Sequence, residues 1–73
     1  MSTDNLWVRN ALSDAKSLFM AGFSAEETAA TIYKRYRDIA RINTRCSWLD
    51  VEAVRIALEE KLRVKIGKTE YEF

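Results

Sequence analysis

The chain has no histidine and no proline, and only one cysteine and two glycines among its 73 residues. Histidine is the most common general base and metal ligand in proteins, so its absence removes the usual basis of acid–base catalysis and of a metal site. The single cysteine, Cys46, forms no intramolecular disulfide and offers zinc only one thiolate. Two glycines are too few for a phosphate-binding loop. We therefore predict a protein that is not an enzyme and uses no metal, cofactor or small-molecule substrate.

Long apolar runs and an excess of one charge are also missing. Twelve Lys and Arg oppose eleven Asp and Glu, for a net charge of +1, which provides no overall attraction to nucleic acid or to an anionic membrane. A membrane-spanning helix needs roughly 20 apolar residues in succession, and the first residues lack the basic start and apolar run of a signal peptide. We expect one domain, residues 1–73, that is soluble and cytoplasmic and binds no membrane.

Apolar residues at helical spacing predict a first helix over about residues 5–20. Thr3 or Asp4 is placed to cap its start. Gly22 follows its last apolar residues and predicts a Schellman ending in which Phe23 packs back on the helix, because glycine adopts the left-handed conformation without a steric penalty. Local signals thus bound this helix at both ends.

Two further helices are predicted over about residues 25–42 and 48–61. Ser24 and Glu27 have the spacing of a capping box at the start of the second helix, and Ser47 is a suitable N-cap for the third. The third helix has apolar residues on two sides, and a helix of that kind should lie between other elements. These two stripes comprise Val51, Val54, Leu58 and Leu62 on one side and Leu49, Ala53 and Ile56 on the other.

After the third helix the apolar residues alternate instead of following a helical period. The alternation reaches Ile66, is interrupted by Gly67 and Lys68, and resumes at Thr69, which suits a two-residue hairpin turn. Pairing Ile66 with Thr69 places apolar residues opposite each other on one face and opposite charges on the other. We therefore predict a mainly α fold, a three-helix bundle with a C-terminal β-hairpin over about residues 62–73.

Basic side chains follow one side of the second helix. Lys34, Arg37 and Arg41 lie in a row, and Arg45 extends it if the helical path continues. Arg37 and Arg41 are one turn apart and repel each other; Asp38 offsets part of this repulsion, and an anionic partner would relieve more. A solvated helix face without a partner would show the same pattern. The candidate partner-binding residues, the last two of them near the hairpin turn, are Lys34, Arg37, Arg41, Arg45, Lys65 and Lys68.

Three helices followed by a hairpin resemble a winged-helix domain. Residues 47–73, with the run Val-Arg-Ile-Ala-Leu-Glu-Glu-Lys-Leu, look like that family's recognition helix and wing. The resemblance implies a role in transcription and a third helix that reads DNA. The third helix is acidic, however, and side chains such as Asp50 and Glu52 would repel the DNA backbone where arginine or lysine is expected. The expected contact therefore shifts from DNA to protein.

These patterns favour a small non-enzymatic transcription regulator that binds a protein of the transcription machinery, either RNA polymerase or an associated factor. In size and lack of catalytic groups the chain resembles phage-encoded inhibitors of host RNA polymerase. One alternative is a DNA-binding winged-helix regulator that uses the basic face of the second helix and the hairpin. Another is an inhibitor of a different intracellular nucleoprotein complex. DNA binding that falls steeply with salt would favour the first alternative.

Overall fold

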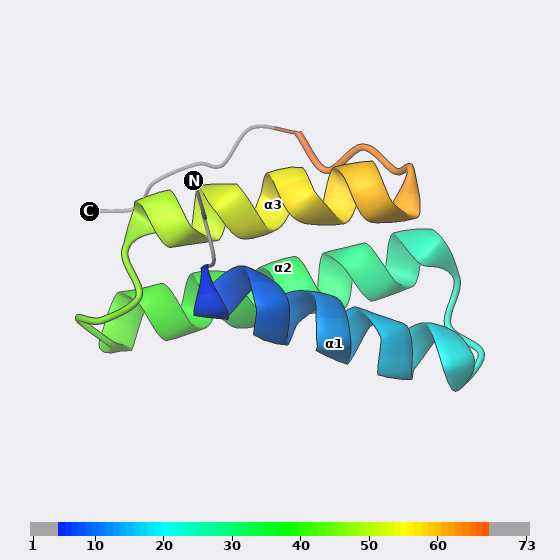
Figure 1. The fold of residues 1–73 in the computed structure, drawn as a ribbon, viewed down its shortest axis with the longest axis horizontal. Helices are drawn as coiled ribbons and strands as arrows, with labels where there is room; N and C mark the ends of the chain where they lie inside the picture. The colour runs from blue at the N-terminus through cyan, green and yellow to red at the C-terminus, as the bar shows by residue number, and fades with distance from the viewer. Residues whose placement is uncertain (1–4, 68–73) are drawn as a thin grey trace.

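Three α-helices packed side by side form the described part of the molecule, residues 5–67 of a computed structural model (Figure 1). They are α1 (Leu6–Met20), α2 (Ala25–Ile42) and α3 (Trp48–Leu62). Each helix runs antiparallel to the one before it, and each packs against both of the others. The three predicted helices are confirmed, and their bounds differ from the prediction by one residue at most.

Capping boxes fix the starts of α2 and α3. At α2, the Ser24 hydroxyl accepts a hydrogen bond from the backbone N–H of Glu27 at 3.1 Å, and the Glu27 carboxylate accepts one from the N–H of Ser24 at 3.2 Å. Ser47 and Asp50 make the same exchange at α3, at 3.2 and 3.0 Å. Both predicted caps are confirmed. They could be predicted from sequence because the two side chains of each cap are only three residues apart.

The start of α1 is capped by Asn5. Its Oδ1 accepts a hydrogen bond from the backbone N–H of Trp7 at 2.9 Å. The expected caps, Thr3 and Asp4, lie outside the described residues. The Asn5 amide also donates a hydrogen bond from Nδ2 to Oδ1 of Asp50 at 3.1 Å. This bond joins the start of α1 to the start of α3.

The end of α1 has the predicted Schellman geometry. Gly22 has a φ of 105°, and its N–H donates to the carbonyl of Phe19 at 3.1 Å. The N–H of Phe23 donates to the carbonyl of Leu18, also at 3.1 Å. These two bonds satisfy carbonyl groups that the helix leaves without a partner at its end.

Replacing Gly22 by L-alanine should lower the free energy of unfolding by about 1–2 kcal/mol, because a Cβ atom disfavours positive φ. No neighbouring atom lies within 4 Å of the added Cβ, so the cost comes from the backbone conformation. Urea denaturation followed by circular dichroism measures it. A synthetic chain with D-alanine at position 22, whose backbone favours positive φ, is the matched control and should be the more stable of the two. Equal stability would contradict the prediction.

The core lies where the three helices meet, and α1 contributes small residues to it. Ala11 and Ala15 are buried, and their short side chains allow α1 to pack closely against α2 and α3. The Trp7 ring packs edge-on against Tyr36, with ring centroids 6.2 Å apart and planes at 84°. Aromatic pairs favour this arrangement. The buried cluster comprises Ala11, Ala15, Ile32, Tyr36, Val54 and Leu58.

α3 buries only one of its two apolar stripes. Val51, Val54 and Leu58 are fully buried, whereas Leu49 is 77% and Ile56 is 43% exposed. The expectation that α3 lies between other elements is therefore wrong for residues 5–67. Both α1 and α2 pack on the same side of α3, the side that carries Val54 and Leu58.

The predicted hairpin is wrong, since the described residues contain no strand and residues 5–67 form an all-helical domain. α3 continues through Leu62, one turn after Leu58, and ends at Arg63 in the left-handed conformation with a φ of 56°. Residues 64–67, which we call the strap, then run back over α3 (orange in Figure 1). Residues 69–73, the expected second strand, lie outside the described residues. The predicted winged-helix-like fold is therefore replaced by a three-helix bundle for residues 5–67.

Glu59 holds the strap in place. Its Oε2 accepts hydrogen bonds from the backbone N–H groups of Ile66, at 2.8 Å, and Gly67, at 3.0 Å. A charged acceptor makes strong hydrogen bonds. In a hairpin, the N–H groups of Ile66 and Gly67 would instead have been directed to a second strand or a turn. Ile66 also packs against the core. The strap alternates between exposed and half-buried residues because it lies against a helix, which explains why its sequence resembles that of a strand.

Candidate protein-binding groove

A groove of about 530 Å³ lies between the outer face of α2 and the strap. Its floor on the α2 side consists of Ala29, Ala30 and Tyr33. Ala29 is buried, whereas Ala30 is exposed and has a side chain too short to fill the space beside it. The strap supplies an apolar wall from Val64 and Ile66, both half-buried. The groove therefore offers apolar surface from two segments that are about thirty residues apart in the chain.

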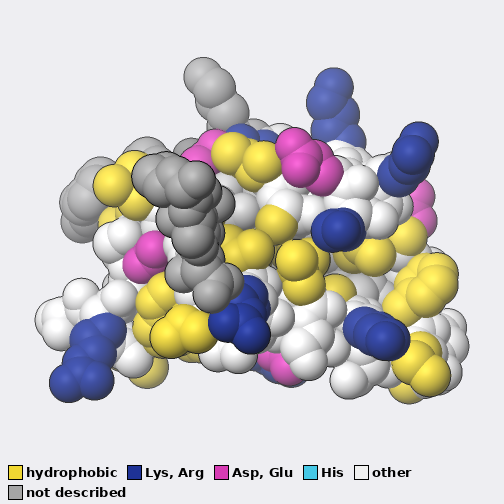
Figure 2. Space-filling view, in the orientation of Figure 1, with side chains coloured by type: hydrophobic (Ala, Val, Ile, Leu, Met, Phe, Trp, Pro, Cys, Tyr) yellow, Lys and Arg dark blue, Asp and Glu magenta, His cyan; other side chains and the backbone are white. Residues whose placement is uncertain are grey.

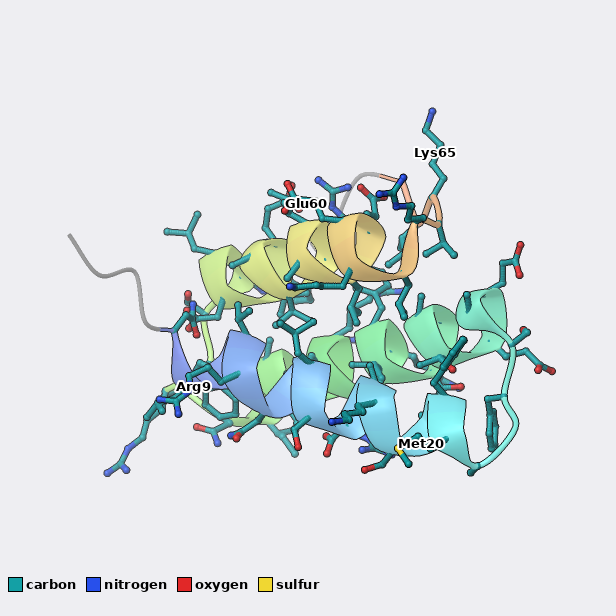
Figure 3. All side chains as sticks on the ribbon, turned by 45° about the vertical axis from the view of Figure 1, so that its right-hand side comes forward. Arg9, Met20, Glu60 and Lys65 are labelled. Carbon is teal, nitrogen blue, oxygen red and sulfur yellow. The ribbon has the colours of Figure 1, made fainter. Side chains whose placement is uncertain are left out.

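Cations line this groove on both sides. Three come from consecutive turns of α2, and the fourth, Lys65, comes from the strap and projects away from the helices (Figure 3). The guanidinium carbon of Arg37 lies 5.7 Å from the centre of the Tyr33 ring, within the range of a cation–π contact. This contact holds the Arg37 guanidinium near the Tyr33 ring. The cations that line the groove are Lys34, Arg37, Arg41 and Lys65.

Two carboxylates also line the groove. Oδ1 of Asp38 lies 3.9 Å from Nη1 of Arg41, as expected from their spacing, and about half of each side chain is exposed. An exposed pair at this distance contributes little to stability. The second carboxylate, Glu26, lies in the first turn of α2. The groove is thus acidic at the start of α2 and basic towards the end of the helix.

The structure brings together four of the six predicted partner-binding residues, Lys34, Arg37, Arg41 and Lys65. Arg45 does not line the groove. α2 ends at Ile42, and Arg45 lies in the connection to α3, where its backbone N–H donates to Oδ1 of Asn43 at 2.9 Å. The basic row therefore does not continue through Arg45, because the helical path does not. Lys68 lies outside the described residues.

The face on which α1 lies in front of α2 has no comparable row (Figure 2). Its Lys and Arg side chains are scattered among apolar and acidic ones. A smaller, apolar crevice lies between α1 and α3, with Lys16 and Lys61 among its lining residues. The concentration of cations beside apolar surface therefore distinguishes the α2 groove from this face.

The acidic side chains of α3 are largely engaged within the molecule. The guanidinium of Arg55, only 13% exposed, pairs with Glu52 through Nε at 3.0 Å and a second short contact, and with Glu59 through Nη1 at 3.1 Å. These contacts raise the pKa of Arg55. The Asp50 carboxylate accepts one hydrogen bond from the backbone N–H of Ser47 in the α3 cap and another from the Asn5 amide. Arg55 therefore offsets part of the negative charge that the sequence places on α3.

Several residues that shape the groove were not among the sequence candidates. Tyr33 precedes Arg37 by four residues, a spacing at which an arginine can contact an aromatic ring on a helix, and this signal was available. Val64 and Ile66 were assigned to a hairpin face. No sequence pattern pointed to Glu59, because its partners are backbone N–H groups whose positions depend on the path of the strap.

The side chains that line the groove are apolar, cationic and carboxylate. Among residues 5–67, no group of three or more His, Cys, Asp or Glu side chains could hold a metal ion. Cys46 is 2% exposed, and burial, followed by the charge of Asp50, raises the pKa of its thiol. A thiol with a raised pKa forms little of the reactive thiolate near neutral pH.

Comparison with known proteins leaves the groove as the main guide to function. No family model, curated protein or solved structure matches the chain. None of the helices within residues 5–67 combines the length and apolar content that a membrane span requires.

Proposed function

We propose that the protein is a non-enzymatic regulator that acts by binding another protein in the α2 groove. The observation that carries this proposal is the position of the four cations Lys34, Arg37, Arg41 and Lys65, which two separate chain segments place around one apolar floor. Protein interfaces combine a desolvated apolar centre with a polar rim, and the groove has both parts. Binding of this kind does not require a chemically reactive side chain.

A protein partner fits this groove better than duplex DNA. DNA binding depends on many phosphate contacts from Lys and Arg, whereas Glu26 and Asp38 contribute negative charge to the groove and its floor is apolar. The net charge of +1 adds no general attraction to DNA. These features favour a partner that presents both carboxylates and apolar side chains.

We further propose the transcription machinery as the setting, with RNA polymerase or an associated factor as the partner. This part of the proposal is supported by the likeness in size and lack of catalytic groups to phage-encoded inhibitors of RNA polymerase. Its direct test is binding to purified bacterial RNA polymerase, with and without its promoter-specificity factor. Run-off transcription from a promoter template should fall as the protein is added.

Changing Arg37 and Arg41 together to glutamate should weaken polymerase binding at least about tenfold, because two rim cations become anions. Biolayer interferometry measures the affinity, and circular dichroism checks that the helices persist. The matched control is Lys16→Glu with Lys61→Glu, which changes the net charge equally at exposed positions that do not line the groove. Equal affinities of the two double variants would remove the groove from the proposal. Tighter, salt-sensitive binding to duplex DNA than to polymerase would favour a nucleic-acid function instead.

A further inference from the structure

We infer that the groove takes an acidic segment of the partner in which one apolar side chain is flanked by carboxylates. This inference rests on the proposed function and specifies the chemistry of the partner. Its basis is the arrangement of apolar and cationic groups across the groove, between Tyr33 on α2 and the strap residues Val64 and Ile66.

The apolar part of the groove offers a place for an anchoring side chain. Ala30 is exposed and Tyr33 is half-buried on α2, and Val64 and Ile66 line the same groove from the strap. Both strap residues are half-buried, so an inserted leucine or phenylalanine would cover apolar surface that water now reaches. Removing this surface from water favours binding.

The cations are placed to meet carboxylates on both sides of that anchor. Lys34 lies beside Tyr33 on α2, and Lys65 lies between the two apolar strap residues. Both lysines are exposed and form no ion pair with a carboxylate among residues 5–67. A segment with carboxylates on each side of its apolar residue would pair with both walls at once.

The charges along α2 also give the bound segment a direction. Glu26 and Arg41 are fifteen positions apart, or about 22 Å along the helix. Carboxylates beyond the anchor are attracted towards Arg37 and Arg41 and repelled from Glu26. The partner segment should therefore have more negative charge at the end that approaches Arg41.

The probe for this inference is the synthetic peptide acetyl-Glu-Asp-Leu-Asp-Glu-amide, titrated into the isotope-labelled full chain and followed by NMR. Amide shifts should concentrate at Ala30, Tyr33, Lys34 and the strap, and the affinity should fall as salt is added. Two control peptides define the chemistry. One replaces the leucine by serine, and the other replaces all four carboxylates by lysine; both should bind at least about tenfold more weakly.

A variant with Lys34→Glu and Lys65→Glu tests the two walls together. It should lose at least about tenfold in peptide affinity, whereas the variant with Lys16→Glu and Lys61→Glu should retain the affinity of the unmodified chain. Equal binding of the leucine and serine peptides would overturn the inference, since no apolar anchor would then be recognised. Shifts confined to α1 would overturn it as well, as would a duplex oligonucleotide that displaces the peptide at equal concentration.

These results separate the inference from the proposed function. Peptide binding without polymerase binding would support the groove chemistry and reject RNA polymerase as the partner. Polymerase binding that is sensitive to Arg37→Glu with Arg41→Glu, combined with no binding of the leucine peptide, would support the proposed function and reject the inference.

Discussion

Replacing Leu58 by alanine is expected to lower the free energy of unfolding by about 2–5 kcal/mol. Leu58 has no exposed surface and packs in the cluster to which all three helices contribute. A domain of this length has a total stability of roughly 4–11 kcal/mol, at about 0.05–0.15 kcal/mol per residue. The substitution therefore removes a large part of that stability. A strongly lowered urea midpoint, measured by circular dichroism, is the expected result.

Leu49→Ala is the matched control for this prediction. It makes the same chemical change in the same helix, at a position that is 77% exposed. Surface substitutions of this kind usually change stability by no more than about 0.5 kcal/mol. If Leu49→Ala destabilised the protein as much as Leu58→Ala, the apolar side of α3 would have been assigned incorrectly.

Glu59→Gln is expected to release the strap while leaving the three helices folded. The substitution keeps the size of the side chain but removes the charge that accepts hydrogen bonds from Ile66 and Gly67 and pairs with Arg55. Hydrogen exchange at the Ile66 and Gly67 amides should accelerate roughly tenfold or more, because hydrogen bonds to charged acceptors are stronger than those to neutral ones. The probe peptide should also bind more weakly, since Val64 and Ile66 would no longer be held as a wall of the groove.

Glu60→Gln is the control for this substitution. Glu60 is the adjacent exposed carboxylate on α3, and Figure 3 shows it on the α3 surface. Its replacement should leave the exchange of the Ile66 and Gly67 amides unchanged. Similar acceleration in both variants would mean that overall charge, rather than the two hydrogen bonds of Glu59, fixes the strap.

Acid should reproduce the effect of Glu59→Gln. The hydrogen bonds from Ile66 and Gly67, and then the charge of Arg55, lower the pKa of Glu59 from its ordinary value of 4.5. Because its pKa is lower in the folded state than in the unfolded state, this carboxylate stabilises the strap fully above pH 4.5. The stabilisation is lost as the pH falls through the lowered pKa. NMR shifts of the two strap amides should therefore move together only at pH below 4.5.

The helices were predictable from sequence because their signals are local. The capping boxes at Ser24 and Ser47 and the stop at Gly22 each depend on residues within one turn of the helix end. The hairpin was not predictable in the same way. Leu62 fits both an alternating strand and the helical spacing from Leu58, and the buried contacts of the helix decided the outcome.

The candidate site was predictable only in part. The helical period placed Lys34, Arg37 and Arg41 on one side of α2, and this arrangement is independent of the rest of the fold. The groove itself requires a second wall, and its position follows from the hydrogen bonds of Glu59 to the strap. A contact between a side chain and backbone groups seven or eight residues away has no sequence pattern of its own.

The hydrogen bond between Asn5 and Asp50 makes the beginnings of α1 and α3 interdependent. Asp50 also belongs to the capping box with Ser47, and Asn5 caps α1. Fraying of either helix would thus deprive the other of a polar contact, although 45 positions separate the two residues. This end of the bundle should open as one cooperative unit, while the opposite end, where the strap begins, can loosen by itself.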